Sequence, residues 1–239
     1  MKRKANTPSL SKALILDESL RLLAEKGIQA FSIRDLARRL ETYPTAIYWY
    51  FHNKNALLGE IANRVMSNVT PSDEALTGQG WLNVLFQNYR EAIKQHPHVS
   101  DLIGARLLAN AHQNPSLLEG VLTALLEMKC PERHLVTMYN TTVAAMCGFA
   151  TMEFGHLPQE DLQQWRDQLQ AKADRLNAAD YPNLTRSLPQ MMNRAFVLRW
   201  QNGHEQPMND SFNRYVDVVL AGLQGQIAAM IAVTEEAQR

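Results

Sequence analysis

The chain has 239 residues, and its 24 Lys/Arg and 24 Asp/Glu give a formal net charge of zero. This length suits one large domain or a small domain joined to a larger one. Leu, Ala, Gln, Glu and Arg are abundant, β-branched residues are sparse and no segment alternates strictly between apolar and polar residues, which argues against a β-sheet and predicts an all-α protein.

The charges are distributed unevenly along the chain. Residues 1–68 carry 11 Lys/Arg against 6 Asp/Glu, whereas residues 69–239 carry 13 against 18. This asymmetry indicates a polyanionic partner at the basic end. No segment approaches the roughly 20 apolar residues of a membrane span, because Asp217, Gln224 and Gln226 interrupt the last apolar helix. The N-terminus also lacks the apolar core of a secretory signal, so we expect a cytoplasmic protein with no membrane partner.

The first predicted helix covers residues 8–26, with Thr7 or Ser9 as its N-cap and Gly27 as its C-terminal stop. A second helix follows Ser32, because Asp35 three residues later completes a near capping box. The apolar positions at helical spacing predict the buried faces of these two helices: Ala13, Leu16, Leu20 and Leu23 in the first, and Ile33, Leu36, Ala37 and Leu40 in the second.

After a short break at 41–43, Pro44 suits the first turn of a third helix that runs only to Phe51. A fourth helix is predicted over 54–68, and the Pro- and Gly-containing segment 69–80 is typical of a linker. We therefore divide the chain into a helix-turn-helix domain at 1–68 and a helical ligand-binding and dimerisation domain at 69–239. Two short helices joined by a turn in a basic segment have the geometry of a helix-turn-helix that reads DNA.

The third helix is predicted to bury Ile47 and Phe51 and to direct its other side chains outward. Exposed Tyr and Trp are unusual on a merely solvated face. In a major groove, Thr and Ala can contact a thymine methyl group, Tyr and Trp can contact the backbone, and Arg34 can bind guanine. Lys54 is placed for a phosphate at the start of the fourth helix. Alternatively, the aromatic residues pack against the fourth helix or the body.

The same residues resemble the DNA-binding domain of TetR-family regulators. The resemblance is carried by the runs Phe31-Ser32-Ile33-Arg34-Asp35-Leu36-Ala37-Arg38-Arg39-Leu40, Ala46-Ile47-Tyr48-Trp49-Tyr50-Phe51 and Lys54-Asn55-Ala56-Leu57-Leu58. It implies base contacts from Arg34, Pro44, Thr45 and Ala46, with Tyr43 at the start of the same helix, and backbone contacts from Tyr48, Trp49 and Lys54. It also implies a helical, dimeric, ligand-binding C-terminal domain.

Two departures from the family pattern affect DNA reading. Glu41 replaces the usual turn glycine, and Tyr43-Pro44 replaces the small or polar residues usual at the start of the recognition helix. A non-glycine residue at a position of positive φ costs on the order of 1 kcal/mol. The operator sequence preference of the family therefore does not transfer to this chain.

Seven further helical patterns fill the body: residues 81–95, 99–111, 115–128, 132–154, 159–177, 185–200 and 209–234. The pattern at 132–154 is apolar nearly all round, so its polar residues need partners if they are buried. We expect a small, mostly apolar effector to bind among residues of this segment and of 99–111, with Arg106, Asn110, Asn140, Met146, Phe149 and Glu153 as the candidates. The alternative is that these residues are satisfied core polars or a subunit contact.

The last helix carries a long apolar stripe: Val216, Val219, Leu220, Leu223, Ile227, Met230 and Ile231, with Gly222 and Gly225 nearby. A stripe of this length favours packing against another helix. The family resemblance implies that this helix belongs to a second copy of the chain, and packing within one chain is the alternative. We expect no cofactor and no metal, because His96, His98, His112 and His156 have no ligand-type spacing with Cys or carboxylates. Cys147 is a packing residue or, less plausibly, a redox sensor.

The sequence as a whole predicts a homodimeric repressor that binds a palindromic DNA operator and is released by a small-molecule effector. An activator or a ligand-independent regulator would have the same fold, and the sequence does not separate these. An enzyme is disfavoured, because the sequence contains no nucleophile–base pair, phosphate loop or paired carboxylates.

Overall fold

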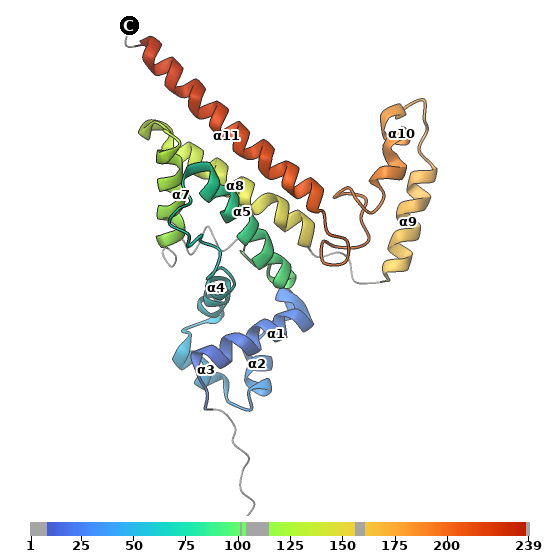
Figure 1. Cartoon of the computed structure of the whole chain (residues 1–239). Helices are drawn as coiled ribbons and strands as arrows, with labels where there is room; N and C mark the ends of the chain where they lie inside the picture. Colours follow the sequence, from blue (N-terminus) through green and yellow to red (C-terminus); the bar gives the residue numbers. More distant parts are fainter. Residues whose placement is uncertain (1–8, 101, 104–114, 156–160, 238–239) are drawn as a thin grey trace, which may run out of the picture.

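The computed structural model describes residues 9–100, 102–103, 115–155 and 161–237. Within these ranges the chain is helical and contains no β-strand. Figure 1 shows a small N-terminal head, a larger helical body and an arm that projects to one side of the body. The all-α prediction is confirmed.

The head consists of α1 (Lys12–Ala30), α2 (Ile33–Arg39), α3 (Pro44–Tyr50) and α4 (Lys54–Val65). The N-cap of α1 is Ser11 rather than Ser9, because the Ser11 Oγ accepts the Leu14 N–H at 3.2 Å; Thr7 lies outside the described residues. Gly27 breaks the helical geometry with φ 69°, as a C-terminal stop should, although a further turn continues to Ala30. Ser32 and Pro44 begin α2 and α3 as predicted.

One small apolar core holds the four helices of the head together. Its buried members come from every helix: Ile15, Leu16, Leu22 and Leu23 from α1, Leu36 and Ala37 from α2, Ile47 from α3, and Leu57, Leu58 and Ile61 from α4. Because α3 has only seven residues, it depends on this packing rather than on its own helix propensity.

The body is built from α5 (Gly78–Gln95), α7 (Pro115–Glu127), α8 (Leu135–Phe154) and α11 (Asn209–Ala237). α5 packs against α7 and α8, and α11 lies across α5 and α8 (Figure 1). The short 3-10 helix η1 (Pro97–Val99) follows α5 and contacts α1, which joins the body to the head. A second 3-10 helix, η3 (Glu132–His134), precedes α8. Most of the helix predicted at 99–111 lies outside the described residues.

The arm contains α9 (Leu162–Asp174) and α10 (Pro182–Met191), which stand away from the body in Figure 1. The predicted helix at 185–200 is wrong at both ends. Pro182 starts α10 at a first-turn position, and after Met191 the chain turns through Asn193, whose φ is 58°. Arg199 is buried where the arm returns to the body, and its guanidinium donates to the carbonyls of Gln201 and Gln206.

α11 is long and apolar enough to cross a membrane by length and composition, with a mean hydropathy of 1.7 in an 18-residue window within Asn209–Val233. The sequence prediction that no segment approaches this limit is therefore wrong by that measure. The helix nevertheless buries one stripe against α5 and α8, formed by Phe212, Val216, Leu220, Leu223 and Ile227. The buried stripe covers one face of α11, and 22% of its apolar window is buried within the chain, so the other faces of the helix are not covered by the described residues.

Candidate nucleic-acid interface

The turn between α2 and α3 is a helix C-terminal motif closed by two backbone hydrogen bonds. The Glu41 N–H donates to the Arg38 carbonyl at 3.2 Å, and the Thr42 N–H donates to the Ala37 carbonyl at 2.9 Å. Glu41 adopts φ 50°, the left-handed conformation that glycine usually supplies in this motif. The predicted departure at Glu41 is therefore a real backbone strain, and the turn keeps the geometry in spite of it.

α3 presents its aromatic residues to solvent. Ile47 is fully buried and fixes the rotation of the helix on the core, so the remaining positions face outward. Trp49 is 87% exposed, Tyr43 79% and Tyr48 45%. Thr45 is also exposed, whereas Pro44 and Ala46 are half-buried. The alternative that Trp49 packs against α4 or the body does not hold.

Two described basic residues of the head differ from the others in having no acidic partner. Most described basic residues of the head are paired with acids: Lys12, Arg21, Lys26, Arg38, Arg39 and Arg64. Among the described residues of the head, Arg34 and Lys54 are the basic residues that form no ion pair. Arg34 is exposed in the first turn of α2. The uncompensated charges therefore flank α3 along the chain, on α2 before it and at the first residue of α4 after it, and a polyanion could contact them there.

The Lys54 ammonium makes two contacts within the head that the sequence did not predict. Its Nζ donates to the Phe31 carbonyl at 2.6 Å and lies 5.6 Å from the centroid of the Phe31 ring. An ammonium group has two further N–H donors for a phosphate. The carbonyl contact fixes where those donors point.

The sequence analysis missed Tyr50 as a contributor to this surface. Its hydroxyl donates to the Leu10 carbonyl at 2.7 Å, so it anchors the chain just before α1 against the end of α3. The signal was the Tyr48-Trp49-Tyr50 run, in which three consecutive aromatic residues cannot all face a small core.

Four of the six predicted effector residues lie in the described part of the chain, all on α8. Arg106 and Asn110 lie outside the described residues. Met146 and Phe149 are buried, and the Phe149 ring packs against three aromatic rings at centroid distances of 5.1–5.4 Å: Phe196, Phe212 and Tyr215. Asn140 is exposed on the other side of α8. An exposed Asn140 needs no partner within the single chain.

Glu153 is buried and satisfied within the chain. Its carboxylate accepts two hydrogen bonds from Arg90, both at 2.7 Å, and one from the Met208 N–H at 2.8 Å. Arg90 also donates to the Asn209 side chain at 2.9 Å. These contacts tie α5, α8 and the start of α11 together, which favours the alternative that Glu153 is a core polar residue rather than an effector ligand.

The described residues hold no group of three His, Cys, Asp or Glu side chains close enough for a metal ion. His96 and His98 face each other edge to face, with ring centroids 6.1 Å apart. Burial raises the pKa of the Cys147 thiol, which keeps it protonated at neutral pH and favours a packing role over redox sensing.

The geometry defines a class of protein: a helix-turn-helix head with an exposed aromatic recognition helix, joined to a separate helical body. Two family models match this chain. The model described as bacterial regulatory proteins, tetR family, matches residues 15–61, and the model described as tetracyclin repressor-like, C-terminal domain, matches residues 70–227. The chain belongs to the TetR family.

Individual relatives are distant. The chain is 29% identical over 97 residues to tetracycline repressor protein class D of Escherichia coli. This alignment covers 36% of this chain and 44% of the relative. The alignment thus spans less than half of that protein. A TetR regulator from Streptomyces coelicolor has a similar structure (TM-score 0.67, 22% identity, 91% of this chain and 99% of the other). BioQ, solved with its double-stranded DNA operator, also has a similar structure (TM-score 0.56, 23% identity, covering 70% of this chain and 97% of that chain).

Proposed function

We propose that this protein is a transcriptional repressor that binds a palindromic DNA operator as a homodimer and is released by a small-molecule effector. The observation that carries the proposal is the α3 surface, where Tyr43, Tyr48 and Trp49 are exposed and where Arg34 and Lys54 flank the helix in the sequence. Exposed aromatic rings lose the free energy of burial in the unbound protein, and a DNA groove restores it. A cytoplasmic location follows from this role.

DNA reading divides between two sets of side chains. Arg34 is placed to bind a guanine edge, and Thr45 and Ala46 are placed to contact thymine methyl groups, so these residues would set the sequence preference. Tyr48, Trp49 and Lys54 would contact sugar and phosphate and set the affinity and its dependence on salt. The structural relative solved with its operator supports a DNA partner for this fold.

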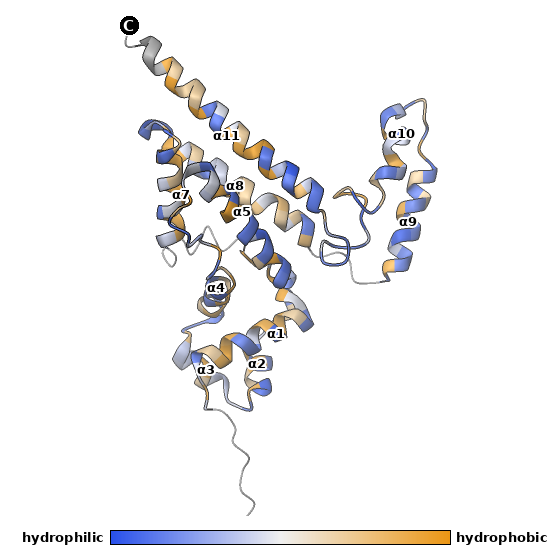
Figure 2. Cartoon of the chain, viewed as in Figure 1, coloured by the Kyte–Doolittle hydropathy of each residue, from blue (hydrophilic) through white to orange (hydrophobic). Residues whose placement is uncertain are grey.

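A second copy of the chain would cover the open faces of α8 and α11. Val136 and Met152 are exposed on α8, and Val218 and Val233 are exposed on α11; Figure 2 shows apolar residues along both helices. Three glycines on these helices have open space where a Cβ atom would lie: Gly148, Gly222 and Gly225. Four residues of the apolar stripe predicted to meet the partner are buried within the chain, Val216, Leu220, Leu223 and Ile227, whereas Val219, Met230 and Ile231 are half-buried. The dimer contact would therefore extend over the opposite, glycine-containing face of α11.

The effector would bind in the body. Met146 and Phe149 provide an apolar surface there, and Arg106 and Asn110 remain the predicted polar contacts. The name of the Escherichia coli relative identifies it as a tetracycline repressor, which supports a small-molecule effector for this body type and makes tetracycline the first compound to test. An effector releases the protein only if it binds the DNA-incompetent arrangement more tightly.

The test is selection of bound sequences from a random duplex library with wild type, Tyr48→Ala and Arg34→Ala. Tyr181→Ala is the matched control, because Tyr181 is similarly exposed but lies in the arm. We expect enrichment of a palindrome by wild type and the control, with loss of affinity in Tyr48→Ala and relaxed preference at one base in Arg34→Ala. Equal enrichment by all four proteins would exclude α3 as the reading helix.

The dimer is tested separately by light scattering. Wild type should have about twice the 27.1 kDa chain mass. Gly222→Arg places a long charged side chain on the open face and should give monomers, whereas Ala24→Arg on the exposed side of α1 should not.

A further inference from the structure

The chain enters the head directly beside the end of α3. The hydroxyl of Tyr50, the last residue of α3, donates to the Leu10 carbonyl at 2.7 Å. Ser11 then caps α1 in an extended conformation. Figure 1 shows the start of α1 next to α3. The residues that precede Leu10 therefore start from the edge of the α3 surface.

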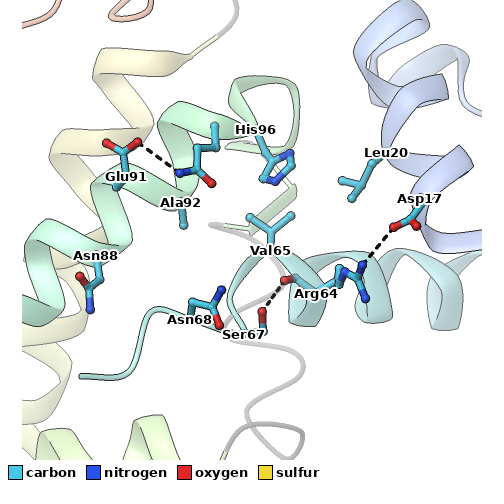
Figure 3. Close-up of a pocket in the computed structure, with 11 residues that line it drawn as sticks. Asp17, Leu20, Arg64, Val65, Ser67, Asn68, Asn88, Glu91, Ala92 and His96 are labelled. Atoms are coloured by element: carbon cyan, nitrogen blue, oxygen red, sulfur yellow. Dashed lines mark hydrogen bonds and ion pairs between the residues drawn. The ribbon is translucent and has the colours of Figure 1, made fainter. Parts of the chain in front are cut away.

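The described basic residues of α1 are already compensated within the head. Each has an acidic partner: Lys12 with Glu60, Arg21 with Glu18 and Lys26 with Asp35. From α4, Arg64 Nη2 also lies 3.2 Å from Asp17 Oδ1 of α1 (Figure 3). The helix itself thus offers little free positive charge to a polyanion.

The sequence before Leu10 supplies positive charge without any acid. Lys2, Arg3 and Lys4 all precede Asp17, the first acidic residue of the chain. Residues 2–9 contain no large apolar side chain, so this segment would gain little by packing on the head core. Residues 1–8 lie outside the described part of the chain. Their composition suits contact with a polyanion rather than with the protein.

We propose that residues 2–4 enter the DNA minor groove next to the major groove that α3 reads, and that Arg3 selects A·T pairs there. This inference rests on the proposed operator binding. Lys4 lies six residues before Leu10, and an extended chain of this length spans roughly 20 Å. Major grooves on one side of a duplex are about 34 Å apart, so the intervening minor groove lies roughly 17 Å away and within reach. The narrow minor groove of A·T-rich DNA has an enhanced negative potential that attracts arginine, and the neighbouring lysines can contact phosphates.

The test is selection of bound sequences from a random duplex library by the full-length protein, compared between wild type and Arg3→Ala. Arg175→Ala is the matched control, because it removes the same charge from an exposed position at the end of α9 in the arm. Wild type and the control should enrich A·T pairs outside the palindrome, and Arg3→Ala should not. Tyr50→Phe removes the hydroxyl that holds Leu10 and should weaken the same flank preference, because Tyr50 is a positioning residue for this segment.

Inosine shows which groove carries the contact. An I·C pair presents the major-groove pattern of G·C but lacks the minor-groove amino group of guanine. Wild type should therefore bind the selected duplex equally well with I·C or A·T flanks, and roughly tenfold more weakly with G·C flanks, within the usual range for a mismatched base pair. Arg3→Ala should bind all three duplexes alike.

The salt dependence counts the charges involved. Each phosphate contact contributes about 0.9 to the slope of log K against log salt, so the triple variant Lys2→Ala/Arg3→Ala/Lys4→Ala should have a slope shallower by up to about 2.7 per subunit. Equal flank enrichment by wild type and Arg3→Ala, or equal weakening by I·C and G·C flanks, would overturn the proposal. A shallower slope without any flank preference would also overturn it, because the segment would then contact phosphates alone. Failure of wild type to enrich any palindrome would instead refute the proposed operator binding, and this inference with it.

Discussion

The buried pair of Arg90 and Glu153 gives the sharpest test of how the body is held together. The Glu153 side chain is fully buried and Arg90 is 12% exposed, with two 2.7 Å hydrogen bonds between them. Arg90→Met leaves the carboxylate in the core with one remaining donor, the Met208 N–H. Breaking a buried pair in this way costs about 3–5 kcal/mol of unfolding free energy. Glu153→Gln keeps an acceptor for Met208 and should cost less, roughly 1.5–3 kcal/mol.

The assay is urea unfolding followed by circular dichroism at one fixed protein concentration, since a dimer's stability depends on concentration. The double variant Arg90→Met/Glu153→Gln contains no unpaired buried charge, so it should be more stable than Arg90→Met alone. Arg214→Met is the control, because its exposed partner Asp217 lies 3.7 Å away and the change should be too small to measure. A double variant whose loss equals the sum of the two single losses would refute this account.

Three further substitutions test local features. Glu41→Gly should raise the unfolding free energy by about 0.5–1 kcal/mol, because glycine adopts the left-handed conformation without strain; unchanged urea stability would contradict this. The Ser32 hydroxyl, followed by Lys26, lowers the pKa of the Asp35 carboxyl from its ordinary value of 3.8. The ionised carboxylate therefore stabilises the fold above that value, and the stabilisation is lost as the pH falls through the lower pKa of the folded state. Asp35→Asn should lower the melting temperature near neutral pH but not in strong acid. Gly203→Ala should destabilise the protein, because the new Cβ would clash with Glu153 Cγ; a wild-type melting temperature would show that the loop yields.

The head could be predicted from the sequence because local signals agree there. Ser32 accepts from the Asp35 N–H, Pro44 opens α3, and Asn53 caps α4, each as short-range chemistry requires. The burial of Ile47 and the exposure of Trp49 follow from the same helical period. The first residues of α2, α3 and α4 are thus set by residues within a few positions, although the packing of these helices joins distant parts of the head.

The body was less predictable because its contacts join distant residues. Glu153 lies 63 positions from Arg90, so periodicity indicated a buried polar residue but could not name its partner. The C-terminal end of α10 was misplaced because the apolar residues Phe196 and Val197 continue the pattern past Asn193, where the chain turns. The apolar stripe of α11 was correctly identified, but periodicity does not distinguish a partner within the chain from one in another chain.

The connection between head and body suggests how a change in the body could alter DNA binding. A dimer reads two half-sites only when its two α3 helices are spaced to match successive major grooves, about 34 Å apart. η1 follows α5 directly and contacts α1, so a shift of α5 moves the head as a unit without changing its internal packing. Arg90, which holds α5 to α8, lies on this same helix. An effector that displaces α5 by even a small amount would therefore change the spacing of the reading helices, because the head core is rigid and the joint is short.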